Sequence, residues 1–394
     1  MVSVAEAEKI ILGHPFLPKI ESVALELGNG RILAEEIKAD RDLPPFDRAT
    51  MDGICIAYRA YQNRQHKFDV VGEQAAGQTQ KTLNDPTQSL EIMTGASLPI
   101  GTDTVVPYEA IELNNNIAAI KEVVSKNQNV HRQGADAKKG EVLLHPGQKL
   151  SAAEIALLAS VGKSYVSVYK NPMTAIISTG DELVAIEQTP LPHQVRKSNS
   201  YALMAALQEM NVQADSFHLN DDPVEIEEKL KLILENYELI ILTGGVSKGK
   251  HDYVPAVLES LRVEKLFHGI SQRPGKPLWF GVSPKNFVFA LPGNPVSTLL
   301  CFHRYVKPWL MKSFHQTLNS QFAVLIEDFH FEPQLTYFLQ VKIKNENGTL
   351  MAHPHKGGGS GDFANLKDVD GFLELPLGRK RFSIGDYFTL FLLK

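Results

Sequence analysis

The chain has 394 residues, which predicts roughly two to four domains. With 43% apolar residues, 22% charged residues and a formal net charge of −5, it has the composition of a globular protein, and the charge argues against a nucleic-acid partner. Its two cysteines, Cys55 and Cys301, are too few for a disulfide framework or a cysteine zinc site. The sequence contains no basic targeting segment and no apolar run of about 18 residues, so we expect a cytoplasmic protein without a membrane span.

Two helical patterns flank the first third of the chain. Each begins with a Ser-x-x-Glu capping box, at Ser3 and at Ser151. Their apolar faces are similar, which predicts that the two helices pack together. We therefore expect one elongated, discontinuous domain made of residues 1–40 and 137–170.

The segment between these parts, residues 41–136, alternates short β-like runs with turns, which predicts an inserted, mostly-β domain. It contains a proline-rich loop that ends at Asp52 and a Met-Thr-Gly-Ala turn that carries Thr94. Both loops could meet a ligand. The alternatives are a solvated connector for the first loop and a capped turn for the second.

Residues 171–315 alternate strand and helix patterns, which indicates an α/β domain with a parallel sheet and right-handed crossovers. The expected strands are 173–178, 213–219, 240–243 and 287–291. Polar clusters follow them at 179–182, 220–222, 243–252 and 292–295. The carboxyl ends of parallel strands share one edge of a sheet, so these clusters should converge on a ligand there.

Three carboxylates in these clusters, Glu182, Asp221 and Asp252, are candidate ligands of a Mg²⁺ ion that also contacts phosphate. The alternative for each of them is capping of a helix.

The glycine-rich loop from Gly244 to Lys250 is close to a phosphate-binding Walker A loop. However, the next residue is His251, where that loop needs Ser or Thr on Mg²⁺. Backbone N–H groups of such a loop favour phosphate or oxyanion binding. There are two alternatives. One is a nucleotide-dependent transferase with a P-loop-like site, and the other is a glycine turn that binds no ligand.

The tail, residues 320–394, reads as short strands with an Asn347-Gly348 hairpin turn, which predicts a C-terminal β-barrel or sandwich. A glycine-rich loop that carries Ser360 could meet a charged ligand or form a flexible surface loop.

Several motifs occur together over the whole chain. They are Pro-Pro-Phe-Asp-Arg-Ala-Thr-Met-Asp-Gly at 44–53, Met-Thr-Gly-Ala at 93–96, Ser-Thr-Gly-Asp-Glu-Leu at 178–183, Thr-Gly-Gly-Val-Ser at 243–247, Arg-Pro-Gly-Lys-Pro at 273–277 and Leu-Pro-Gly-Asn-Pro-Val-Ser at 291–297. In this order they resemble the molybdopterin molybdenumtransferases, the MoeA and gephyrin E-domain family.

This resemblance implies a four-part architecture and a homodimer, with the site between one subunit's α/β domain and parts of the other subunit. It also implies the reaction, in which adenylylated molybdopterin and molybdate give molybdenum cofactor and AMP. The implied partners are an upstream molybdopterin adenylyltransferase and downstream molybdoenzymes or cofactor-maturation proteins. A non-catalytic molybdopterin-binding scaffold is the alternative from another class.

The motif matches and the chemistry together give the candidate site residues. The candidate catalytic residues are Asp52, Thr94, Glu182, Asp221 and Asp252, of which the last three are also the metal ligands. The candidate substrate-binding residues are Gly244, Gly245, Ser247, Lys248, Lys250, Arg273, Lys276, Pro292, Pro295 and Ser360.

Three positions depart from the family pattern. A lysine expected near Gly269 is absent, and Arg273 stands where the family usually has a second lysine. Of a basic cluster expected near residue 131, only His131 and Arg132 remain. Molybdate is an oxyanion and needs N–H groups or cations around it. We therefore expect Lys248 or Lys250 to compensate.

Overall fold

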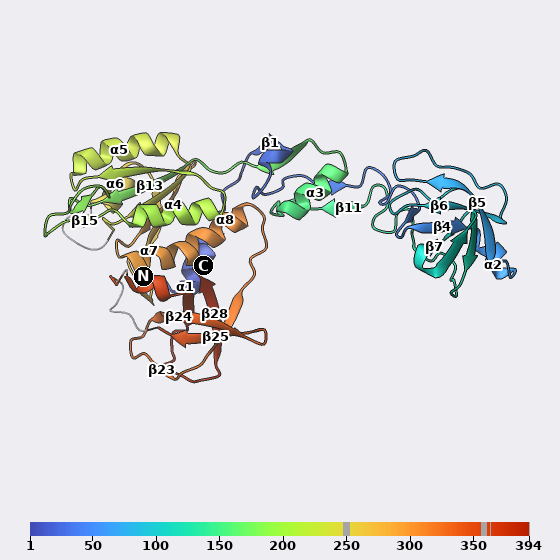
Figure 1. Ribbon diagram of the computed structural model, residues 1–394. Helices are drawn as coiled ribbons and strands as arrows, with labels where there is room; N and C mark the ends of the chain where they lie inside the picture. Colours follow the sequence, from blue (N-terminus) through green and yellow to red (C-terminus); the bar gives the residue numbers. More distant parts are fainter. Residues whose placement is uncertain (247–252, 356–360, 363, 394) are drawn as a thin grey trace.

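The computed structural model describes residues 1–246, 253–355, 361–362 and 364–393. Figure 1 shows an elongated molecule with a β-rich unit at one end, a narrow connecting part, and two further units packed together at the other end. No helix in the described ranges is long and apolar enough to cross a membrane.

The narrow part is held by two antiparallel strand pairs and one helix. Its elements are β1 (Ile20–Ala24) with β12 (Tyr165–Tyr169), β2 (Ile37–Lys38) with β11 (Val142–Leu144), and α3 (Ala152–Ser160). Leu33, Leu158 and Val168 are fully buried in its small core. Segments from both sides of the β-rich insertion therefore pair with each other in this part of the molecule.

The N-terminal helix α1 (Val4–Leu12) begins with the predicted capping box, in which Ser3 and Glu6 each accept a hydrogen bond from the other's backbone N–H. The predicted packing of this helix against α3 is wrong. Ile11 belongs to the core of the α/β unit, whereas Leu158 of α3 belongs to the core of the narrow part. The pattern of a helix identifies its buried face but not the element that covers it.

The β-rich unit at the far end is a six-stranded sheet of order β7-β4-β6-β5-β9-β8. Its strands are β4 (Gly53–Ile56), β5 (Lys67–Gln74), β6 (Gln88–Ile92), β7 (Thr104–Pro107), β8 (Ile111–Asn114) and β9 (Ile117–Ile120), with the short α2 (Tyr58–Gln62) beside it. A separate pair, β3 (Arg48–Ala49) with β10 (Val130–His131), leads into this unit and out of it. The segment is thus mostly β.

The α/β unit contains a six-stranded sheet of order β16-β13-β17-β21-β20-β18. The parallel strands are β13 (Thr174–Thr179), β16 (Ala214–Leu219), β17 (Leu239–Thr243) and β21 (Phe287–Leu291), close to their predicted bounds. The strand β20 (Trp279–Val282) pairs antiparallel with β21, and β18 (Glu264–His268) pairs antiparallel with β20; neither strand was predicted. The sheet is therefore mixed, with its parallel part at the predicted place.

Helices cover both faces of this sheet. They are α4 (Asn199–Glu209), α5 (Pro223–Asn236), α6 (Val254–Ser260), α7 (Pro295–Cys301) and α8 (Lys307–Ser313), with a π-helical turn (Phe302–Val306) between the last two. Neighbouring strand residues enter opposite layers: Ile241 packs with α4, α7 and α8, and Ile240 packs with α5 and α6. This explains the continuous apolar run of the central strand.

The C-terminal unit is a closed barrel. Its strands are β22 (Gln321–Leu325), β24 (Thr336–Glu346), β25 (Thr349–Pro354), β26 (Gly371–Leu375) and β28 (Tyr387–Leu392), and the β24–β26 pairing closes the ring. Asn347 and Gly348 have φ of 52° and 89° between β24 and β25, as the predicted hairpin turn requires. The short β19 (Gln272–Arg273) pairs with β24 and joins the barrel to the α/β unit. The exact residue limits of the four-part division stay a prediction.

Candidate functional site

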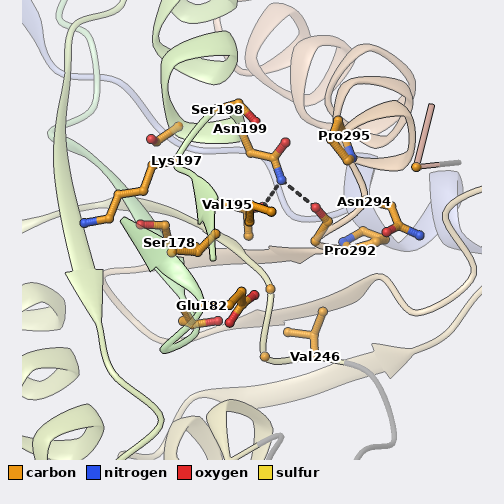
Figure 2. A pocket seen from close by; sticks show the side chains of 18 of the residues that line it. Ser178, Glu182, Val195, Lys197, Ser198, Asn199, Val246, Pro292, Asn294 and Pro295 are labelled. Atoms are coloured by element: carbon orange, nitrogen blue, oxygen red, sulfur yellow. Dashed lines mark hydrogen bonds between the residues drawn. The ribbon is translucent and has the colours of Figure 1, made fainter. Parts of the chain in front are cut away.

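A cavity of about 700 Å³ lies at the carboxyl ends of β13, β17 and β21, in front of the first residues of α4 and α7 (Figure 2). Five of the predicted site residues line it: Glu182, Gly244, Gly245, Pro292 and Pro295. The polar clusters after three of the parallel strands therefore converge, as expected for the ligand-binding edge of an open α/β sheet.

The glycine turn after β17 brings the backbone close to the neighbouring strand. Gly244 and Gly245 have φ of 94° and 66°, and a Cβ on either would lie 2.8 Å from Thr179 Oγ1. Glycine is needed at both positions, because another side chain would be strained and would collide with Thr179. The Thr179 hydroxyl is buried and makes no hydrogen bond with any described residue.

Gly180 allows the side chain of Glu182 to fold back over its own loop. It has φ of 127°, and a Cβ at this position would lie 2.3 Å from Glu182 Oε2. The Ser-Thr-Gly-Asp-Glu-Leu motif thus combines a strand end, a glycine that permits a tight turn, and a carboxylate at the wall of the cavity.

A residue that the sequence reasoning missed joins three sides of the cavity. The side-chain amide of Asn199, at the start of α4, donates hydrogen bonds to Thr243 Oγ1 at 2.9 Å and to the Gly293 carbonyl at 2.7 Å (Figure 2). Lys197 and Ser198 line the same wall and were also missed. The only signal in the sequence is a helical pattern that begins at Asn199, where a polar residue resembles an ordinary helix cap.

A second cavity of about 510 Å³ lies between the α/β unit and the barrel. The predicted cations Arg273 and Lys276 line it. Pro277, Pro292 and Asn294 line both cavities, so the two adjoin at the Pro-Gly-Asn-Pro loop. Arg196 and Lys197 line the first cavity together with Glu182, so cationic side chains border both cavities.

Of the three carboxylates expected to bind a metal, the structure describes Glu182 and Asp221 but not Asp252. Glu182 lines the first cavity, and the backbone N–H of Asp221 donates to Asp181 Oδ1 at 3.0 Å in the next loop. Asp222 caps α5 by accepting from Val224 and Glu225 N–H groups, as expected of that position. Among the described residues no three His, Cys, Asp or Glu side chains cluster as a metal site would.

Asp52 and Thr94 lie together, but in the distant β-rich unit. Thr94 donates its backbone N–H and its hydroxyl to Asp52 Oδ1, at 2.6 Å and 2.9 Å. These two bonds lower the pKa of Asp52 below its usual value. Within one chain, the unit that holds this pair stands at the opposite end of the molecule from the cavity (Figure 1).

Five predicted site residues lie outside the described residues. They are Ser247, Lys248, Lys250, Asp252 and Ser360. Their roles stay predictions.

Family models match nearly the whole chain. The matches are to the MoeA N-terminal region (domain I and II) over residues 2–162, a probable molybdopterin binding domain over 175–312, and the MoeA C-terminal region (domain IV) over 323–393.

Full-length relatives agree with these matches. A molybdopterin molybdenumtransferase of Synechocystis sp. is 40% identical over 401 residues, which cover 99% of this chain and all of the relative. A protein of the same name from Bacillus subtilis is 32% identical, covering 98% of this chain and 92% of the relative.

Solved structures extend the likeness to the fold. The crystal structure of the molybdopterin biosynthesis MoeA protein from Pyrococcus horikoshii OT3 superimposes with a TM-score of 0.85 at 28% identity, covering 100% of both chains. A second MoeA structure from the same organism gives a TM-score of 0.82 at 31% identity, covering 100% of this chain and 99% of the other. The chain therefore belongs to the MoeA family of molybdopterin molybdenumtransferases, as its motifs predicted.

Proposed function

We propose that this chain transfers molybdenum: it takes adenylylated molybdopterin and molybdate and forms molybdenum cofactor with release of AMP. The observation that carries the proposal is the convergence of three family motifs, Thr179–Leu183, Thr243–Val246 and Pro292–Pro295, around one cavity at the sheet edge. The full-length identity to relatives named for this activity supports it.

The chemistry of the two cavities suits the reaction. Cleavage of a phosphoanhydride needs charge neutralisation and an oriented attacking oxygen. The first cavity offers a glycine turn and a carboxylate, Glu182, beside a nucleotide–pterin substrate. The second offers Arg273 and Lys276, which suit an oxyanion such as molybdate.

We infer that Glu182, Asp221 and Asp252 would hold a Mg²⁺ ion. Carboxylate oxygens are the ligands that Mg²⁺ prefers, and Glu182 borders the cavity where a phosphate would bind. When bound, the ion would supply charge neutralisation at the phosphoanhydride.

We further propose a homodimer in which Asp52 and Thr94 of a second copy complete the site. These residues are far from the cavity within one chain, and their carboxylate and hydroxyl are partly occupied with each other. The buried free thiols Cys55 and Cys301 suit action in a reducing cytoplasm. The expected partners remain an upstream molybdopterin adenylyltransferase and downstream molybdoenzymes or maturation proteins.

The reaction is tested by AMP release from adenylylated molybdopterin, measured with and without molybdate. We expect release with formation of molybdenum cofactor. Binding without release would favour a molybdopterin-binding scaffold, and turnover of free nucleotide would favour a P-loop-like transferase.

The shared site is tested by mixing two inactive variants, Asp52→Ala and Glu182→Ala, after unfolding and refolding them together. Random pairing should restore about a quarter of the wild-type rate, because half of the dimers then carry one intact site. A mixture of Glu182→Ala with the variant Asp221→Ala, which changes the same side of the site, is the control and should stay inactive. No recovery in the first mixture would contradict a site shared between subunits.

A further inference from the structure

A stack of three aromatic rings forms the barrel side of the second cavity. The ring of Tyr337, in β24, has its centroid 4.3 Å from that of Phe331 and 5.5 Å from that of Phe329, with interplanar angles of 25° and 10°. Phe329 belongs to the short strand β23 (Phe329–His330). Phe331 is buried, whereas Phe329 and Tyr337 are half-buried and line the cavity. The stack therefore has one buried ring and two rings that border the cavity.

The strand pairing places a cation beside this stack. Arg273 of β19 and Tyr337 of β24 occupy paired positions in the parallel ladder, so their side chains share one face of the sheet. Burial raises the pKa of the Tyr337 phenol, and the nearby charge of Arg273 opposes that shift. Arg273, Lys276 and the two half-buried rings line the same cavity. Aromatic and cationic groups are therefore neighbours on one wall.

This combination suits a flat ring that is joined to an anion. Aromatic side chains bind planar heterocycles by stacking, and they do so with little dependence on the hydrogen-bonding edge of the ring. Arginine and lysine bind oxyanions. The cavity has a volume of about 510 Å³, which is in the range of small-molecule sites.

The proposed substrate has two flat ends, a pterin and an adenine, and its chemistry decides between them. Molybdenum is transferred to the two sulfurs attached to the pterin part, so molybdate has to be bound next to that part. Arg273 and Lys276, the cations that suit molybdate, line the second cavity. The pterin therefore belongs in that cavity. The nucleotide end can reach the first cavity, because the two adjoin at Pro277, Pro292 and Asn294.

We propose that Phe329 and Tyr337 form a stacking platform for the pterin ring of the substrate, beside the molybdate bound by Arg273 and Lys276. The proposal rests on the proposed function for the identity of the substrate. It assigns the two ends of the substrate to different cavities, with the pterin on the barrel side of the second cavity and the nucleotide at the glycine turn of the first.

The test is a titration of the full-length protein with three separate probes: neopterin, which is a fluorescent free pterin, AMP and molybdate. We expect Tyr337→Leu to weaken neopterin binding about tenfold, because stacking on an aromatic ring is lost. The same variant should bind AMP and molybdate as wild type does. Phe329→Leu should also weaken neopterin binding. Tyr337→Phe, which keeps the ring and removes the hydroxyl, should retain most of the affinity.

Tyr387→Leu is the matched control. Tyr387 is a barrel tyrosine that also contacts a phenylalanine, Phe322, but it is 70% exposed and lies outside the lining of the second cavity. It should leave neopterin binding unchanged. Thermal unfolding of each variant shows that it is folded.

Three results would overturn the proposal. Wild type could fail to bind neopterin at millimolar concentration, or Tyr337→Leu and Phe329→Leu could both bind it as wild type does. A loss of AMP affinity in Tyr337→Leu with unchanged neopterin affinity would place the adenine, and not the pterin, on the platform.

AMP-release kinetics separate this proposal from the proposed function. If the platform binds the pterin in the ground state, Tyr337→Leu should raise KM for adenylylated molybdopterin with a smaller change in kcat. A wild-type protein that binds neopterin through Tyr337 yet releases no AMP would refute the transferase reaction and leave the platform standing. Normal AMP release with an unchanged KM in Tyr337→Leu would refute the platform alone.

Discussion

The side-chain amide of Asn199 donates a hydrogen bond to Thr243 Oγ1 at 2.9 Å and thereby ties the start of α4 to the end of the central strand β17. The same amide also holds the Gly293 carbonyl. One side chain thus fixes the spacing of three walls of the cavity. We expect its loss to disturb catalysis more than folding.

The first prediction is that Asn199→Ala lowers kcat/KM for AMP release about tenfold or more, whereas the free energy of unfolding falls by only about 1–2 kcal/mol. Urea unfolding and AMP-release kinetics measure the two effects. Asn236→Ala is the control, because it removes an amide that donates to the Leu232 carbonyl at the end of α5, away from the cavity. Equal kinetics in both variants would contradict a role of Asn199 in the cavity.

The second prediction concerns the glycine turn. Gly244→Ala places a methyl group 2.8 Å from Thr179 Oγ1 and 2.9 Å from the Thr179 carbonyl, at a φ of 94°. We expect a loss of roughly 1–3 kcal/mol in unfolding free energy and of most AMP release, since the turn must shift away from the ligand edge. Gly378→Ala, also at positive φ but with open space around it, should keep its activity. Full activity in Gly244→Ala would exclude a close approach of substrate here.

Much of the site was visible in the sequence because strand ends and glycine turns leave local signals. Pro292 and Gly244 follow apolar runs, and the sheet rule then places them together. Asn199 could not be found this way. Its role depends on contacts across the cavity, to Thr243 and Gly293, which no local pattern encodes.

The fold shows the same limit. Capping predicted the start of α1 at Ser3, and turn chemistry predicted the hairpin at Asn347-Gly348. The sequence did not predict which elements pack against α1, and it did not predict the strands β18 and β20. Both depend on which apolar surfaces meet in three dimensions.

The third prediction concerns the junction of the α/β unit with the barrel. Arg304, buried in the π-helical turn, donates to Glu374 of β26 at 2.8 Å and to Glu8 of α1 at 3.0 Å. Burial raises the pKa of Glu374, although Arg304 opposes the shift. We expect Arg304→Met to lower the unfolding free energy by about 3–5 kcal/mol, because it leaves a buried carboxylate without its cation.

A second substitution tests that reason. The double variant Arg304→Met with Glu374→Leu should recover part of the loss, since it removes the orphaned carboxylate. Lys380→Met, which breaks the exposed pair with Glu332, should cost less than about 1 kcal/mol. An Arg304→Met protein as stable as wild type would show that the buried pair does not hold the two units together.

The last prediction is a pH dependence of stability set by His303. Burial, and to a lesser degree Lys307, lowers the pKa of His303 to about 4, and its Nδ1 has no hydrogen-bond partner among the described residues. In the unfolded chain the pKa is about 6.5, so the unfolded state takes up the proton first as the pH falls. Stability should therefore decrease as the pH falls from about 6.5 towards 4.

Between pH 7 and pH 5, protonation of His303 should lower the unfolding free energy of the wild type by about 2 kcal/mol. The variant His303→Gln should not show this decrease. Urea unfolding at both pH values measures the difference. His193→Gln, at an exposed histidine, should keep the wild-type dependence. If wild type and His303→Gln lose stability equally over this range, His303 does not remain neutral in the folded core, and the acid sensitivity of the protein comes from other groups, such as His218, whose pKa is also lowered by burial.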